Sequence, residues 1–241
     1  MSPSALSTAT LLAGLTLGGL HAQNTAVRAR DLYLEKLPAA PAGAAAAHHL
    51  GLRYNVLLVD PQTRQTRDVD PDAVFHEGDC FAIEFTPNRG GSLYVFNHGS
   101  SGAWHLLMPA PGIEEDTGSV KAGELRRVPV DYCFRLDEKP GVETMLLAIT
   151  EREEDIRDLR AMLAKPGSEP GSAATVASTS AAPNPAADLI ESWQGLASRD
   201  LKIEKIPRPE TPGERPNSVY VVKSSAATSD RLVVEIKIRH E

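Results

Sequence analysis

The amino-acid sequence predicts a mainly β protein, an antiparallel β-sandwich with one or two peripheral helices and a disordered internal insertion. Apolar residues alternate with a period of two in many short segments from Leu50 onwards. Proline, glycine and asparagine separate these segments, as they do in turns. All five phenylalanines lie between Phe75 and Phe134. Because large aromatic side chains bury the most apolar area per residue, we expect the core to form around them.

The expected strands follow one another at short intervals, and each ends at a turn signal. Asp60-Pro61 begins a turn after the first strand, and residues 87–91, which end in two glycines, form another. Residues 92–97 are apolar at most positions, which predicts a central strand covered on both faces. We expect strands at residues 52–58, 66–69, 80–86, 92–97, 103–108, 125–130, 132–136 and 144–150, with further strands after residue 200.

The chain divides into five expected segments. They are a signal peptide (1–22), an N-terminal segment and linker (23–49), a β-rich core domain (50–165), a disordered linker (166–186), and a short helix with C-terminal strands that complete the same sheet (187–241). A small separate C-terminal domain is the alternative for the last segment, because two or three strands alone are only marginally stable.

Three stretches depart from the alternating pattern. Residues 31–37 can form a short strand ahead of the core. A helical stripe of apolar residues predicts a helix over 151–165, and a second short helix is expected over 188–197. Residues 166–186 are almost all alanine, serine, threonine, glycine and proline. Such a segment buries too little apolar area to offset the entropy lost on ordering, which predicts disorder.

The N-terminus has the pattern of a secretory signal peptide. An apolar run over residues 9–20 precedes Ala22, a small residue at the expected cleavage site. The run is shorter than the ~20 residues that a bilayer span needs, so we expect no stable membrane span once the signal is removed. The expected location is the periplasm, the outer envelope or the extracellular space.

The chain has two cysteines, Cys80 and Cys133. Both fall on the less apolar face of their expected strands, where Cys80 alternates with Phe81 and Cys133 with Phe134. In an oxidising compartment the pair can form a disulfide, and two separate thiols are the alternative. The sequence has no CxxC motif and no Cys/His cluster of the kind that binds zinc, and we expect no metal.

Charge and loop composition argue against two other classes of ligand. The formal net charge is −7, whereas non-specific nucleic-acid binding needs a basic surface, so we expect no nucleic-acid partner. The glycine-rich loops follow strands but open no helix, so they do not match a phosphate-binding loop. We therefore expect no nucleotide and no other cofactor.

No catalytic residue is assigned from the sequence. Ser100 and Ser101 lie between His98 and His105, so a hydrolase would use this loop region. A polar hairpin tip explains the same residues without chemistry, because a serine nucleophile is normally presented between a strand and a helix.

Three residues are candidate ligand contacts: Tyr94, Trp104 and Arg89. Tyr94 and Trp104 could form an aromatic patch, although core packing explains aromatic residues in strands equally well. The last expected strand, 232–239, could present an open sheet edge to a partner. Its Lys237 and Arg239 could equally protect that edge from aggregation.

Several short motifs occur in a recognisable order. They are Phe75-x-x-Gly78-Asp79, Leu93-Tyr94-Val95-Phe96, Leu107-Met108-Pro109, Val128-Pro129 and Pro140-Gly141-x-Glu143 before Leu146-Leu147-Ala148. Over residues 52–150 the chain resembles the domain of unknown function 4384, a β-rich bacterial module. The resemblance implies no established activity, substrate or catalytic residue. By analogy alone, it is consistent with an accessory or binding role.

These observations lead to one expected function and two alternatives. We expect an exported, non-enzymatic accessory or binding module of the bacterial envelope, with a protein or a cell-surface polymer as its partner. The first alternative is a secreted hydrolase that uses the loop region of Ser100 and His105. The second alternative is a structural envelope component that self-associates through an edge strand.

Overall fold

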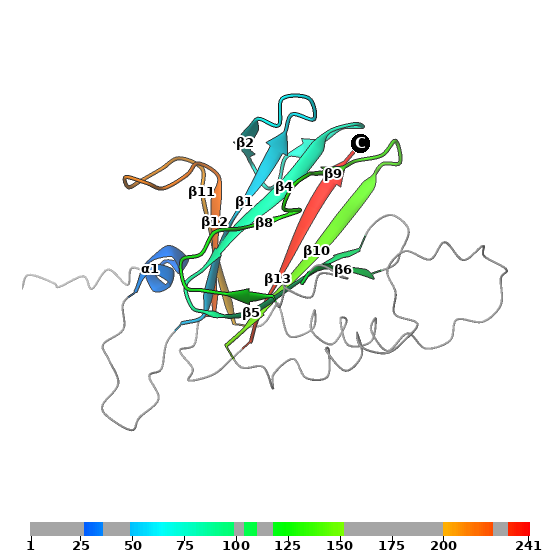
Figure 1. The fold of residues 1–241 in the computed structure, drawn as a ribbon. Helices are drawn as coiled ribbons and strands as arrows, with labels where there is room; N and C mark the ends of the chain where they lie inside the picture. Colours follow the sequence, from blue (N-terminus) through cyan, green and yellow to red (C-terminus); the bar gives the residue numbers. More distant parts are fainter. Residues whose placement is uncertain (1–26, 36–48, 99–103, 110–117, 152–199, 224–230) are drawn as a thin grey trace, which may run out of the picture.

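The computed structural model describes residues 27–35, 49–98, 104–109, 118–151, 200–223 and 231–241. These residues form two β-sheets, which pack against each other around a shared apolar core (Figure 1). The predicted mainly β fold class is confirmed. The expected signal peptide, the linker over 166–186 and the two expected helices over 151–165 and 188–197 lie outside the described residues, apart from Glu151.

The larger sheet contains seven of the described strands in the order β11-β12-β1-β4-β8, with β2 beside β1 and β9 beside β4. All of its pairings are antiparallel. Its strands are β1 (Gly51–Val59), β2 (Thr66–Val69), β4 (Cys80–Pro87), β8 (Arg126–Val128), β9 (Phe134–Arg135), β11 (Leu201–Ile206) and β12 (Ser218–Lys223).

The smaller sheet contains six described strands in the order β3-β13-β10-β5-β6, with β7 beside β5. Its pairings are antiparallel except for the short parallel contact between β3 and β13. Its strands are β3 (Val74–Phe75), β5 (Gly91–His98), β6 (Trp104–Met108), β7 (Ser119–Val120), β10 (Gly141–Thr150) and β13 (Arg231–His240).

The core lies between the inner faces of the two sheets. Because side chains alternate along a strand, every second residue of the long strands points into it. The larger sheet contributes Leu52, Val56, Phe81, Ile83, Phe85 and Val221, and the smaller sheet contributes Leu93, Val95, Met145, Leu147, Ile236 and Ile238. Three phenylalanine rings pack side by side in the core. The ring of Phe81 lies between those of Phe75 and Phe134, with centroid distances of 5.9 and 5.2 Å.

The C-terminal strands are shared between the two sheets. Strands β11 and β12 extend the larger sheet beyond β1, whereas β13 lies between β3 and β10 in the smaller sheet. The tail therefore contributes to both sheets of one core, where the sequence led us to expect a single sheet. Alternation shows which residues of a strand are buried but not which sheet the strand joins.

The expected strand over residues 31–37 is wrong. The structure has a helix, α1 (Ala29–Leu34), at this position. Ala29, Leu32 and Tyr33, at helical spacing, pack on Tyr220 and Val222 of β12. The segment is too short for its period to be read from the sequence alone. Among the described residues, no helix has the length and apolar character needed to cross a bilayer.

Candidate functional site

A cleft of about 470 Å³ opens on the outer face of the larger sheet. Its floor includes Val59 and Cys80, which alternate along β1 and β4 with residues of the core. One wall is the β1–β2 turn, where the chain runs from Asp60 to Arg64, and the opposite wall is the segment Val130 to Cys133. The volume lies within the range of ~300–1,000 Å³ that is typical of small-ligand sites.

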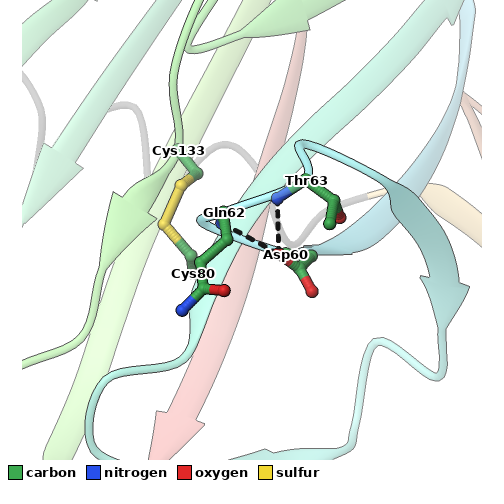
Figure 2. Close-up of a disulfide and its surroundings, with 5 residues drawn as sticks. All are labelled: Asp60, Gln62, Thr63, Cys80 and Cys133. Carbon is green, nitrogen blue, oxygen red and sulfur yellow. Dashed lines mark hydrogen bonds between the residues drawn. A yellow bond between two sulfur atoms is a disulfide. The ribbon is translucent and has the colours of Figure 1, made fainter.

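A disulfide between Cys80 and Cys133 joins the floor of the cleft to one wall (Figure 2). The two Cα atoms are 5.5 Å apart, and the cysteines are separated by 53 residues in the sequence. Cys80 begins β4, and Cys133 immediately precedes β9, whose Arg135 pairs with Cys80. The bond therefore holds the segment before β9 against the outer face of the sheet.

The other wall is the β1–β2 turn, and Asp60 stabilises its conformation. Oδ1 of Asp60 accepts hydrogen bonds from the backbone N–H groups of Gln62 and Thr63, at 2.8 and 2.7 Å (Figure 2). These two bonds stabilise the charged carboxylate and lower the pKa of Asp60 below its ordinary value. Arg64 closes the turn with a φ of 59°, in the left-handed region. Because Oδ1 of Asp60 already accepts these two hydrogen bonds, the carboxylate is less available to a ligand.

Three arginines line the cleft: Arg64, Arg127 and Arg135. None of them forms an ion pair with a carboxylate among the described residues. Arg127 lies directly opposite Glu84 in the β4–β8 pairing, but Glu84 instead forms an ion pair with Arg215. Nε of Arg127 is buried and has no hydrogen-bond partner in the described part of the chain.

Arg215 is held away from the cleft by two carboxylates. Its guanidinium binds Glu84 and also Asp68 of β2, with Nε 3.1 Å from Asp68 Oδ2. Burial alone would lower the pKa of Arg215, but the hydrogen bonds from both carboxylates outweigh it and raise that pKa. The structure thus satisfies Arg215 and leaves Arg127, its neighbour across Glu84, without a counter-ion.

Two large apolar side chains stand exposed beside the arginines. Val130 is 67% exposed and Tyr132 is 68% exposed, and both line the cleft. The floor beneath them is apolar, because Leu57, Val59 and Ala82 cluster there with the disulfide. The arrangement can hold a group that carries a negative charge next to an apolar part, since it offers guanidinium donors above a desolvated floor.

The candidate contacts expected from the sequence lie elsewhere. Tyr94 is 1% exposed and packs in an apolar cluster on the outer face of the smaller sheet, with Trp104 against it. Trp104 also stacks on His98, with ring centroids 4.8 Å apart. Arg89 lies in the turn between β4 and β5, with a buried Nε that has no hydrogen-bond partner among the described residues. The structure brings Tyr94 and Trp104 together but places neither them nor Arg89 in the cleft.

His98 and His105, the two histidines of the hydrolase alternative, project from opposite faces of the smaller sheet. His105 pairs with Asn97, and His98 pairs with Trp104, so the two imidazoles lie on opposite faces. Ser100 and Ser101 lie outside the described residues. The described ranges contain no group of three or more histidine, cysteine or acidic residues that could hold a metal ion.

Sequence reasoning missed the cleft because its arginines come from three separate segments. Arg135 shares a strand face with Cys133, which was visible in the sequence, but Arg64 and Arg127 join them only through the register of β1, β4 and β8. The opposed pair of Arg127 and Glu84 would predict an ion pair. Arg215, which is distant in the sequence, takes that carboxylate instead.

The comparison with known families concerns the middle of the chain. The model of a family described as Domain of unknown function (DUF4384) matches residues 74–153, which confirms the resemblance seen in the sequence. No curated protein and no solved structure matched the chain. The matched span includes both cysteines, Arg127 and Arg135, while Arg64 and its turn precede it. Since the family description names no activity, function has to be argued from the site itself.

Proposed function

We propose that this chain, whose residues 74–153 match a domain of unknown function, is an exported, non-enzymatic binding module of the bacterial envelope that uses the disulfide cleft as its ligand site. The observation that carries the proposal is the geometry of one wall. A disulfide fixes Val130 and Tyr132 at the mouth of a cleft while most of each side chain remains in solvent. Exposed aromatic residues in fixed positions are typical of surfaces that bind a partner.

Export is supported by two independent features. Disulfides form and persist mainly in oxidising compartments, and the chain pairs both of its cysteines. The N-terminal residues 1–22 have the composition of a secretory signal peptide. The proposed location is the periplasm, the outer envelope or the extracellular space, where a protein or a cell-surface polymer would be the partner.

The side chains in the cleft favour binding over turnover. Its polar groups are guanidinium donors, two aspartates and a tyrosine hydroxyl, whereas acyl transfer needs a nucleophile with a general base in hydrogen-bond reach. One of the two aspartates, Asp60, is already bound by its own turn. Such a set can orient a ligand but offers no evident nucleophile and base.

Site-specific photo-crosslinking in living cells tests this proposal. The full chain is expressed in a bacterial host with a benzophenone amino acid in place of Tyr132, and the same probe replaces Ile203 on β11 as the control. Ile203 is equally exposed, at 63%, but lies outside the cleft. We expect a discrete adduct from position 132 in the envelope fraction and none from position 203.

Three results would contradict the proposal. They are retention of the protein in the cytoplasm with free thiols, equal adducts from both positions, or no adduct from position 132. A second test addresses the hydrolase alternative. Purified mature protein is screened on ester, peptide and glycan substrates, and any turnover that Ser100→Ala or Ser101→Ala abolishes would replace binding by catalysis.

A further inference from the structure

We infer that the cleft recognises an acidic peptide segment, with a carboxylate side chain on the three arginines and a neighbouring apolar side chain on the floor. The inference rests on the proposed function, because it names the class of ligand for the same site. Its parts are Arg64, Arg127, Arg135, the disulfide and the exposed Tyr132.

The charge of the cleft runs against that of the whole protein. The chain has a formal net charge of −7, yet the cleft is lined by three arginines and only two aspartates. Asp60 keeps its negative charge, but two backbone N–H groups already bind its Oδ1. Asp131 is the second aspartate of the lining, so the three arginines outnumber the carboxylates by one. A cleft with more guanidinium groups than carboxylates attracts anionic ligands at close range.

Arg127 is the cleft residue with the clearest capacity to bind an anionic ligand. Its Nε is buried without a partner, and the one carboxylate opposite it in the sheet is bound to Arg215. The buried Nε is closed to a ligand, but Arg127 also lines the cleft, so a ligand that supplies a carboxylate to the rest of its guanidinium gains affinity. A carboxylate fits best, because its two oxygens can accept two parallel N–H bonds from one guanidinium.

The apolar part of the cleft favours a peptide over a free anion or a polysaccharide. Val59 and the disulfide form a floor with no charge to offer, and Val130 and Tyr132 add apolar surface at the mouth. An inorganic anion would leave this surface unused. An acidic polysaccharide presents hydroxyl groups beside its carboxylates, whereas a peptide presents an apolar side chain one or two residues from an acidic one. Tyrosine and arginine are also enriched at the centres of protein interfaces.

Selection from a random heptapeptide display library tests the class of ligand. The library is selected on the immobilised mature protein and, in parallel, on the Arg127→Gln/Arg135→Gln variant. We expect the peptides that enrich on the natural protein alone to contain aspartate or glutamate next to leucine, valine or an aromatic residue. The most enriched peptide is then labelled and its affinity measured by fluorescence anisotropy.

Single substitutions then assign the effect to the cleft. We expect Arg127→Gln to weaken binding of the labelled peptide at least about tenfold, and Arg127→Lys to weaken it less, because lysine keeps the charge but not the bidentate geometry. Arg208→Gln removes the same charge from an exposed position outside the cleft and serves as the matched control. Replacing the acidic residue of the peptide by its amide should cost as much as Arg127→Gln.

The outcomes separate this inference from the proposed function. Enriched peptides without acidic residues, or affinities that Arg127→Gln leaves unchanged, would overturn the inference but leave a binding module. Polygalacturonate or inorganic phosphate that binds in an Arg127-dependent manner, with no peptide enriched, would also overturn it in favour of another anion. An absence of any enriched peptide together with no crosslink from position 132 would remove the proposed function as well.

Discussion

The outer faces of the two sheets differ sharply although both sheets share one core. On the smaller sheet, part of the outer face is apolar, and Tyr94, Phe96, Leu146, Ala148 and Val233 are each at most 4% exposed. Farther along β13, the same face carries the exposed residues Glu235, Lys237 and Arg239. On the larger sheet, the outer face carries helix α1 beside β12 (Figure 1). It also carries ion pairs and the disulfide cleft. The smaller sheet is therefore buried on both sides around these five apolar residues, whereas the outer face of the larger sheet carries a cleft lined by arginines.

This difference indicates where stability and recognition reside. Buried apolar surface contributes about 25 cal/mol per Å², so the outer face of the smaller sheet adds a second apolar layer to the core. Exposed arginines contribute little to stability and much to the attraction of a ligand. We therefore expect substitutions of the buried apolar residues on the smaller sheet to lower stability and substitutions of the cleft arginines to affect mainly binding.

The largest effect is expected from Phe96→Ala, on the outer face of the smaller sheet. Phe96 is 2% exposed and packs against Tyr94 and Leu146. Removing a buried phenylalanine ring leaves a cavity and typically lowers the free energy of unfolding by about 3–5 kcal/mol. Chemical denaturation followed by circular dichroism measures this change. Ile203→Ala, at a position 63% exposed, is the control and should change stability by less than about 0.5 kcal/mol. Equal effects from the two variants would mean that the outer apolar face is not a core.

A smaller but still large effect is expected when the disulfide is removed. The double variant Cys80→Ser/Cys133→Ser loses a bond that joins residues 53 positions apart. A cross-link of this kind stabilises by about 2–4 kcal/mol, mainly because it restricts the unfolded chain. Thermal unfolding of the variant, compared with the natural protein, checks the size. If the bond also positions the wall of the cleft, peptide affinity should fall in the variant at temperatures where it remains folded. An unchanged affinity would mean that Tyr132 is held by other contacts.

Strand alternation in the sequence was enough to predict several features of this comparison. The apolar run over residues 92–97 predicted a strand buried on both faces, and Leu93 to Phe96 are each at most 2% exposed. Alternation also put Cys80 and Cys133 on the faces opposite Phe81 and Phe134, and the structure has both cysteines outside the core. These features depend on the pattern within one strand, which a sequence displays directly.

The cleft and the helix could not be predicted in the same way, because they depend on contacts between distant segments. Arg127 is left without a counter-ion only because Arg215, 131 residues from Glu84, binds that glutamate. Helix α1 forms because Tyr220 and Val222, near the other end of the chain, offer an apolar surface to Ala29. The assignment of β13 to the smaller sheet depends likewise on its pairing with β10.

A moderate effect is expected from Glu214→Gln, in the ion-pair cluster that fastens α1 to the larger sheet. Oε1 of Glu214 lies 3.0 Å from Arg30 Nε, as an ion pair without hydrogen-bond geometry, and the two side chains are 3% and 9% exposed. Loss of the carboxylate charge leaves the buried guanidinium less well compensated, at a cost of about 1–3 kcal/mol. Denaturation at neutral pH measures this cost, and Glu138→Gln at an exposed turn is the control.

The same variant should change how stability depends on pH. Burial alone would raise the pKa of Glu214, but the backbone N–H of Glu210, the Tyr220 hydroxyl and Arg30 outweigh it and lower that pKa. When folding lowers the pKa of a carboxyl group, the ionised group stabilises the protein at pH values above its ordinary pKa of 4.5. This contribution is lost as the pH falls below that value. The natural protein should therefore lose more stability than Glu214→Gln between pH 5 and pH 3. Parallel curves for the two proteins would mean that Glu214 adds nothing to the acid sensitivity.

The smallest effect on stability is expected in the cleft itself, from Arg127→Gln and Arg135→Gln. Neither arginine has an ion-pair partner among the described residues, so folding gains no Coulomb energy from them. Removing either charge also relieves repulsion with the other arginines, and Arg127→Gln removes the unpartnered buried Nε–H, so we expect neither substitution to lower the free energy of unfolding by more than about 0.5 kcal/mol. Urea denaturation at low and high salt measures it, with the natural protein as reference. A loss above 2 kcal/mol would show that these arginines stabilise the larger sheet. The cleft would then have a structural role like that of the apolar face of the smaller sheet. A neutral result, combined with lost peptide binding in the same variants, is what separates a recognition surface from a core.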